Sequence, residues 1–140
     1  MDFFDLVVIG GGSAGYAAAN EAQSKGANVA IVDKGPLGGL CILRGCMPTK
    51  TILRSSDILA LIHRAKEFGL SVSNPSANLS LINDRKILLV NEFASYRIEQ
   101  LNDPKFTLIE EYASFLSPHK LNAGKRVLSA KNFIIATGSK

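Results

Sequence analysis

The two cysteines of the chain, Cys41 and Cys46, are separated by four residues, and this spacing suits a reversible dithiol. Residues five positions apart lie about 140° apart around an ideal helix, so an undistorted helix separates their side chains. Gly45 offers the backbone freedom that brings two sulfurs together. Pro48 fits the first turn of a helix that follows, and a thiol at a helix N-terminus is biased toward the reactive thiolate. We interpret the pair as redox-active.

Two other interpretations of the cysteines are a zinc site and a pair of ordinary buried thiols. Zinc sites use about four ligands, and the only histidines, His63 and His119, lie far along the chain. We therefore predict no metal site. Buried thiols fit poorly because Gly38 and Gly39 precede Cys41, and the second cysteine stands in a Gly-Cys-Met-Pro sequence, which is not typical of a core strand. We expect the pair to form a disulfide in air and to open with mild reductant.

A glycine-rich motif precedes the cysteines. The apolar residues 4–9 predict a buried parallel strand, and Gly10, Gly12 and Gly15 follow it as a G-x-G-x-x-G sequence. Such glycines permit a tight turn, close approach of a pyrophosphate, and close helix–strand packing. Residues 16–25 predict the helix, whose N-terminal N–H groups suit phosphate.

An acidic residue completes this motif. Residues 28–32 predict a second parallel strand, and Asp33 follows 18 residues after Gly15, where a carboxylate accepts hydrogen bonds from an adenosine ribose. The motif alone does not distinguish FAD from NAD, and a plain NAD-dependent dehydrogenase with incidental cysteines stays open. A redox dithiol needs an electron relay in contact with it, which favours FAD.

Helices and then short strands fill the rest of the chain. A helix predicted at 80–101 carries an apolar stripe at helical spacing, and we expect this stripe to pack in the core or to form a subunit interface. The stripe ends at Leu101, and an Ala-Thr-Gly segment starts at Ala136. The predicted elements are a helix at 48–68, a loop at 71–78, a helix at 80–101, strands at 106–109 and 113–116, a turn at 122–124, and strands at 126–128 and 132–135; the stripe is Ile87, Val90, Ala94, Ile98 and Leu101.

Composition restricts the possible functions. The chain has 140 residues, enough for one domain with a core, and its net charge of +4 comes without a long basic run. The absence of tryptophan and the scattered charges argue against nucleic-acid binding. The acidic leader differs from a signal peptide, and no segment has the length of a membrane span. We therefore expect a cytoplasmic protein without membrane contact.

The cysteine segment resembles that of class I flavin-dependent pyridine nucleotide–disulfide oxidoreductases, the group of lipoamide dehydrogenase, glutathione reductase and mercuric reductase. The family sequence is roughly Gly-Gly-Thr-Cys-Val-Asn-x-Gly-Cys-x-Pro-Ser-Lys. The chain departs from it at Leu40, Leu43 and Thr49. Both cysteines match, as do Gly45, Pro48, Lys50 and the terminal Ala136, Thr137 and Gly138.

The resemblance implies roles for single residues. Cys41 is expected to attack the substrate, Cys46 to face the flavin, and Lys50 to lie near the reactive edge of the flavin ring. Ala113 occupies the position where the family holds adenine through backbone groups. The residues expected to bind FAD are Gly10, Gly12, Ser13, Ala14, Gly15, Asp33, Lys34, Gly39, Leu40, Cys41, Gly45, Cys46, Lys50, Ala113, Ala136, Thr137 and Gly138.

The resemblance also implies a fold and a reaction. The expected fold is α/β and Rossmann-like, a parallel sheet with flanking helices and a small antiparallel β-meander. Residues 1–140 would form the N-terminal part of an FAD-binding domain, with the nicotinamide-binding and dimer-interface domains outside this chain. Electrons would pass from NAD(P)H through FAD and the Cys41–Cys46 pair to a small-molecule disulfide or related substrate, in a homodimeric full-length enzyme. The 140 residues alone are expected to be inactive; the alternative is a stand-alone flavin-binding redox module without turnover.

Overall fold

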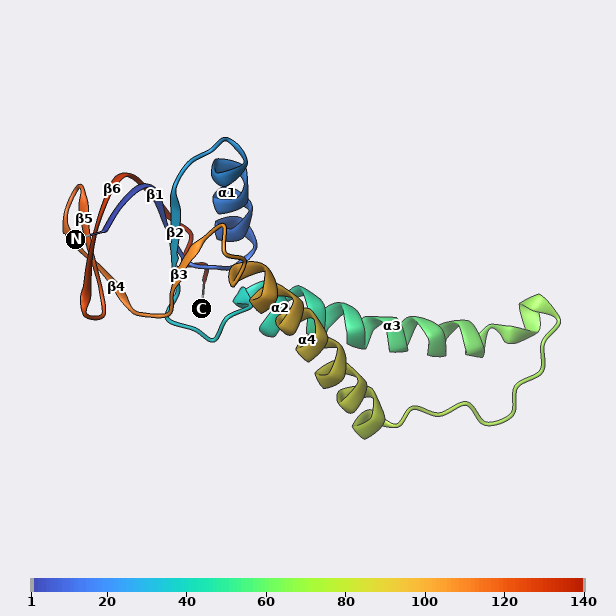
Figure 1. Cartoon of the computed structure of the whole chain (residues 1–140). Coiled ribbons are helices and arrows are strands. Elements are labelled where there is room, and N and C mark those ends of the chain that lie inside the picture. The colour runs from blue at the N-terminus through green and yellow to red at the C-terminus, as the bar shows by residue number, and fades with distance from the viewer. Residues whose placement is uncertain (1, 140) are drawn as a thin grey trace.

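A six-stranded sheet organises the computed structural model, which describes residues 2–139. The strand order is β3-β2-β1-β6-β5-β4 (Figure 1). The apolar strands β1 (Asp2–Ile9), β2 (Val29–Val32) and β3 (Thr107–Ile109) are parallel, and β6 (Arg126–Ile135) continues the parallel sheet beside β1. All four residues of β2 are buried, as expected for a strand that is covered on both faces.

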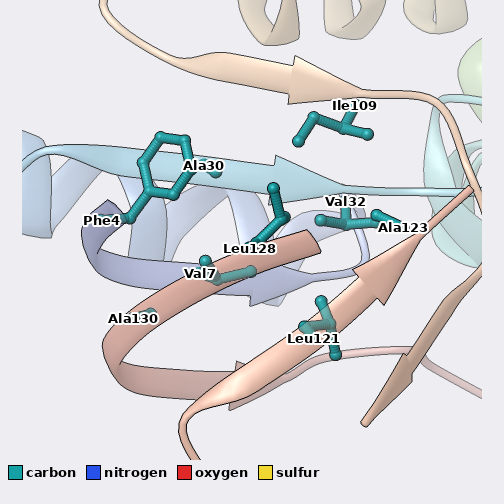
Figure 2. Packing of buried hydrophobic residues seen from close by; sticks show 9 residues of the cluster. All are labelled: Phe4, Val7, Ala30, Val32, Ile109, Leu121, Ala123, Leu128 and Ala130. Atoms are coloured by element: carbon teal, nitrogen blue, oxygen red, sulfur yellow. The ribbon is translucent and has the colours of Figure 1, made fainter. Parts of the chain in front are cut away.

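Successive residues of the strands supply two separate apolar clusters. On one side, Val8 and Ile31 pack with Ala19 of α1 (Ser13–Ser24) and with Leu101. The other cluster joins residues of β1, β2 and β3 with residues of β5 and β6, and Figure 2 shows these side chains gathered together. Alternation of side chains along a strand explains why neighbouring residues belong to different clusters.

Two long helices extend away from the sheet. The short helix α2 (Gly39–Leu43) leads into α3 (Cys46–His63), a 3₁₀ turn η1 (Ala65–Phe68), and α4 (Leu79–Leu101). Figure 1 shows α3 and α4 projecting together beyond the sheet, joined at the far end by an extended connection. We call residues 46–101 the helical arm, and the sheet with α1 and α2 the body.

The antiparallel meander is the β4 (Ala113–Ser117), β5 (Lys120–Ala123) and β6 part of the same sheet. The α/β, Rossmann-like fold class is therefore confirmed. The turn predicted at 122–124 is present but begins later, at Gly124, because residues 122 and 123 end β5. The alternation of polar and apolar residues in β5 was the missed signal. The strands predicted at 126–128 and 132–135 are one continuous strand, β6.

The helix predicted at 48–68 ends earlier. It begins at Cys46 and stops at His63, and the 3₁₀ turn that follows ends at Gly69 in the left-handed conformation. The predicted loop at 71–78 is present, and Asn78 caps α4 by accepting a hydrogen bond from the Leu81 amide. A small polar residue at this position is a favoured N-cap.

The expectation of core packing for the α4 stripe is wrong for most of its length. Leu101 is fully buried against the body, whereas Ile87 and Ile98 are 46% and 37% exposed. Val90 and Ala94 are intermediate. Only the root of α4 therefore reaches the core; the arm beyond it has no sheet to pack against (Figure 1). Across residues 2–139, no helix combines the length and the apolar character that crossing a membrane requires.

Candidate dinucleotide and dithiol site

The glycine motif forms a loop between the carboxyl end of β1 and the start of α1. The Gly10 amide donates to the Val32 carbonyl at 2.8 Å, and Gly10 has a φ of 106°, which favours glycine. A Cβ on Gly10 would collide with the carbonyl of Ala136, and one on Gly15 would collide with the carbonyl of Gly10. Gly10 and Gly15 are therefore required for the close approach of β1, the segment after β6, and α1.

Asp33 follows β2 and holds the glycine loop. Its carboxylate accepts hydrogen bonds from the Gly11 amide at 2.7 Å and from the Gly35 amide at 2.8 Å. A carboxylate has about four lone-pair positions, so both oxygens keep acceptor capacity after these two bonds. Asp33 also lines a pocket at this edge of the sheet. Its remaining lone pairs there suit hydrogen bonds from the hydroxyl groups of a ribose.

A pocket with a volume of about 460 Å³ lies at the carboxyl ends of β1, β2 and β6. Ligands of open α/β sheets bind at this edge. Gly39 is packed so closely on the loop that a Cβ there would lie 2.6 Å from Gly12 Cα. The predicted residues that line the pocket are Gly10, Gly12, Asp33, Lys34, Gly39, Leu40, Ala113, Ala136, Thr137 and Gly138.

The residues present fit the nucleotide part of a dinucleotide. Gly12 lines the pocket, has an ordinary φ of −69°, and would bring its own Cβ no closer than 3.6 Å to Gly39 Cα. The backbone of Gly12 therefore faces the pocket without a side chain, although the packing of the protein would tolerate one at this position. Gly12 also precedes α1 directly, which places a helix N-terminus at the pocket and suits a diphosphate.

The pocket includes residues for which the sequence analysis assigned no role. Glu111 and Tyr112 follow β3, and the Lys34 ammonium lies 5.5 Å from the centroid of the Tyr112 ring. Their position after a parallel strand was the available signal, because β3 ends at the same edge as β1 and β2. The other lining residues without an assigned role are Ile9, Val32, Gly35, Pro36, Leu43, Arg44 and Ser139.

The dithiol lies beside this pocket. Cys41 is in α2, directly after the pocket residues Gly39 and Leu40, and Cys46 is the first residue of α3. The break between the two helices brings their sulfurs together. A Cβ on Gly45 would lie 3.1 Å from the Leu40 carbonyl oxygen and 3.3 Å from Cys41 Cα, so the spacing depends on this glycine.

Both cysteines are free thiols, with Cys41 half-buried and Cys46 exposed. The Cys41 thiol donates a hydrogen bond to Cys46, and this bond is the main reason why the pKa of Cys41 lies above its usual value. Burial and the negative charge of the Cys46 thiolate raise the Cys41 pKa further. The Cys46 amide and the positive charge of Arg97 lower it. Contact with Cys46 is therefore the main cause that holds the pKa of Cys41 above its usual value.

The remaining predicted site residues lie around the pocket rather than in its wall. Ser13, Ala14 and Gly15 form the first turn of α1 behind Gly12. Lys50 is exposed on α3, four residues after Cys46, so the two side chains share one face of that helix. The structure thus places the glycine loop and Asp33 at the pocket and the thiols beside it, with Lys50 exposed on α3.

Comparison with known proteins identifies the class. The sequence profile of the family described as pyridine nucleotide-disulphide oxidoreductase matches residues 4–140. The chain belongs to this family.

Relatives within the family include two kinds of enzyme. The chain is 38% identical over 140 residues to a dihydrolipoyl dehydrogenase of Bacillus subtilis (strain 168), covering 96% of this chain and 31% of the relative. It is 35% identical over 137 residues to a mercuric reductase of Staphylococcus aureus, covering 97% of this chain and 25% of the relative. It thus spans about a third of the former and a quarter of the latter.

Proposed function

We propose that the chain is the FAD-binding part of an NAD(P)H-dependent disulfide oxidoreductase, and that it carries the redox-active pair. The observation that supports this most directly is that the pocket residues and the first cysteine are adjacent in one short helix. Gly39 and Leu40 line the dinucleotide pocket, and Cys41 follows them in the same short helix. A dinucleotide bound at the glycine loop therefore has a dithiol at its side.

The chain would hold FAD through the residues of the pocket. The bare backbone of Gly12 and the N-terminus of α1 would face the diphosphate, and Asp33 would accept hydrogen bonds from the ribose. Backbone groups at Ala113 would hold the adenine. When bound, FAD supplies the two-electron transfer between NAD(P)H and a disulfide.

The cysteines would carry the exchange with the substrate. Once the Cys41–Cys46 disulfide has been reduced, the Cys41 thiolate attacks a substrate disulfide, and one substrate thiol leaves. Cys46 then attacks the mixed disulfide, which releases the second thiol and restores the Cys41–Cys46 bond. The direct contact of Cys46 with Cys41 suits the second step. Lys50 would lie at the reactive edge of the flavin ring, as the family pattern implies.

We expect residues 1–140 to be the N-terminal part of an FAD-binding domain, and the full-length enzyme to be a cytoplasmic homodimer that acts on a small-molecule disulfide or related substrate. The 140 residues contain one G-x-G-x-x-G motif, at Gly10, whereas hydride transfer from NAD(P)H to FAD needs two dinucleotide sites. The chain alone should therefore bind FAD without sustained NAD(P)H oxidation. Sustained oxidation that depends on Cys41, in the presence of FAD and a disulfide, would contradict this.

The variant Gly12→Ala tests FAD binding separately from folding. The alanine Cβ meets only ordinary contacts within the protein, so the unfolding free energy of the ligand-free chain should change little. The same methyl group lies where the diphosphate must approach. Titration followed by flavin fluorescence should show FAD affinity lowered by about tenfold or more, corresponding to about 1.4 kcal/mol.

Gly69→Ala is the matched control. Gly69 lies in the arm with a φ of 71°, and among the described residues other than its two chain neighbours no atom lies within 4 Å of the position that an alanine methyl group would take. This change should lower stability and leave FAD affinity unchanged. If Gly12→Ala binds FAD as tightly as the parent chain, or if the parent chain binds none, the proposed cofactor site is wrong.

A further inference from the structure

The C-terminal end of α4 meets the body (Figure 1), and two of its side chains contact the glycine loop. Leu101 is fully buried, and its two methyl groups lie 3.1 and 3.2 Å from the position that a Cβ on Gly11 would take. Arg97, about one turn earlier, donates from its Nη1 to the Gly12 carbonyl at 3.5 Å. Neither Leu101 nor Arg97 lines the pocket, so the arm contacts the loop from outside the pocket.

The Gly12 carbonyl belongs to the peptide group on which the start of α1 depends. It accepts a hydrogen bond from the Tyr16 amide at 2.9 Å, the first helical bond of α1. The same planar peptide group carries the Ser13 amide, which points opposite to the carbonyl. The Ser13 amide is one of the first N–H groups of the helix, which have no acceptor within the helix. A contact that fixes the Gly12 carbonyl therefore also fixes the direction of an amide that suits a diphosphate.

The Tyr16 ring holds the guanidinium of Arg97 against α1. The guanidinium carbon lies 4.5 Å from the ring centroid, within the range of a favourable contact between a cation and an aromatic ring. The ring packs edge-on against Phe106, with centroids 6.1 Å apart, and Phe106 is buried. Because 3.5 Å is long for a hydrogen bond to a carbonyl, the contact with the ring is the stronger of the two. Arg97 thus spans the first turn of α1, from Gly12 to Tyr16.

Arg97 makes these contacts although part of its guanidinium is poorly accommodated. Its Nε is buried without a hydrogen-bond partner among residues 2–139. An unpartnered buried donor is unfavourable, and methionine would avoid it while keeping an unbranched apolar stem. Replacing Arg97 with methionine should therefore remove an unfavourable group together with the two contacts. The loss should affect the first turn of α1 more than the stability of the whole fold.

We propose that Arg97 is a positioning residue for the glycine loop. By spanning the first turn of α1 from Gly12 to Tyr16, it fixes the orientation of the N-terminal amides and couples the docking of the arm to the binding of FAD. This rests on the proposed function, in which the loop binds the diphosphate of FAD. Coupling between two binding events is reciprocal, so FAD should stabilise the docking of α4 by the same factor by which that docking increases FAD affinity.

Hydrogen exchange measured by mass spectrometry tests the loop without cofactor. In FAD-free Arg97→Met, residues 11–17 should exchange about fivefold faster than in the parent chain, while exchange in β2 stays unchanged. A general loss of stability would speed exchange in β2 as well. Titration followed by flavin fluorescence should show FAD affinity about fivefold lower in Arg97→Met. In the parent chain FAD should slow exchange in the last turn of α4, and this slowing should be weaker in Arg97→Met.

Two further variants serve as controls. Arg97→Lys keeps a cation for the Tyr16 ring but lacks the fork that reaches Gly12 at the same time, so both of its values should lie between those of the parent chain and Arg97→Met. Arg85 is on the same helix, and its Nη1 donates to the Thr51 carbonyl at 3.2 Å, a contact inside the arm. Arg85→Met should therefore change neither the exchange of residues 11–17 nor FAD affinity. If circular dichroism shows that Arg97→Met does not fold, Tyr16→Leu removes the same contact from the side of α1 and should have the same two effects.

The proposal is overturned if Arg97→Met binds FAD as tightly as the parent chain, if its residues 11–17 exchange no faster, if β2 exchanges faster to the same extent, or if Arg85→Met has equal effects. All of these outcomes leave the proposed function intact, because that function requires only that the parent chain binds FAD. A parent chain that binds no FAD would contradict the proposed function. Exchange in the FAD-free chains then decides the role of Arg97 by itself: faster exchange of residues 11–17 in Arg97→Met retains that role, and unchanged exchange overturns it.

Discussion

The body and the helical arm bury their side chains very differently. All four residues of β2 are buried, and large side chains such as Leu121 and Leu128 are fully enclosed. In the arm, all of which the structure describes, Thr51 is the one buried residue of α3, and Leu101 is the one buried residue of α4. Leu88 in the middle of α4 is 59% exposed. Both regions contain apolar residues, but α3 and α4 of the arm pack on each other alone beyond their root, which leaves most of their side chains partly or largely exposed.

This difference places the proposed chemistry at a boundary. Cys41 belongs to the body, and Cys46 is the first residue of the arm. The pocket is built on strand ends that the core holds, whereas the second sulfur depends on the root of a helix with few buried contacts. Burial of apolar area is the main source of stability, so the body should resist unfolding much more than the distal arm.

The largest expected effect comes from truncating the same residue type in each region. Leu128→Ala removes a fully buried side chain and should lower the free energy of unfolding by about 2–5 kcal/mol. Leu88→Ala, at an exposed helical position, should change it by less than about 0.5 kcal/mol. Urea denaturation followed by circular dichroism measures both. Equal losses would show that the arm has a core of its own.

An intermediate loss of stability is expected for glycine-to-alanine changes, and comparing two positions separates backbone strain from steric contact. Gly39 and Gly69 have φ values of 77° and 71°, so alanine is strained at both positions. At Gly39 the added Cβ would also lie 2.6 Å from Gly12 Cα, whereas at Gly69 no described residue other than the two chain neighbours lies within 4 Å of it. Gly39→Ala should therefore cost about 1–3 kcal/mol, and more than Gly69→Ala.

Thermal unfolding of the two variants, compared with the parent chain, checks this order. Gly39→Ala should also weaken FAD binding, because Gly39 lines the pocket. An equal loss of stability in the two variants would mean that the loop and α2 can separate without cost. The close packing of α2 on the glycine loop would then have no role in stability.

The smallest expected effect concerns a surface charge of the body. The Asp5 carboxylate contacts Lys131 Nζ at 2.6 Å and accepts from the Asn28 amide at 2.9 Å. The hydrogen bond from Lys131 is the main cause that lowers the pKa of Asp5 below 3.8. A lowered folded-state pKa stabilises the fold above 3.8, and this contribution is lost as the pH falls below that value.

Asp5→Asn should therefore reduce stability slightly at neutral pH and leave it unchanged at a pH well below 3.8. Glu67→Gln in the arm is the comparison. It removes an exposed pair with Arg64 between residues three apart, and such pairs contribute little. Denaturation curves at the two pH values measure the loss of unfolding free energy in each variant. A pH-independent loss in Asp5→Asn would assign the effect to something other than the carboxylate charge.

Much of the fold could be predicted because its signals are local. The apolar run before Gly10, the glycine spacing and the acid at Asp33 each lie within one β-α-β unit, so spacing alone predicts their neighbours. The bend at Gly45 that joins the thiols is equally local. The predicted parallel strands, both long helices and the fold class were confirmed on this basis.

The sequence by itself thus determined the glycine loop, the position of Asp33 after β2 and the proximity of Cys41 to Cys46, because each depends on residues close together in the chain. Only the tertiary structure decided that β6 is one strand beside β1, that Tyr112 joins the pocket, and that the α4 stripe is largely exposed. It also decided that Arg97 reaches Gly12, 85 positions away in the sequence. Strand order and helix docking depend on contacts between distant segments, and no local pattern encodes which of those segments will meet.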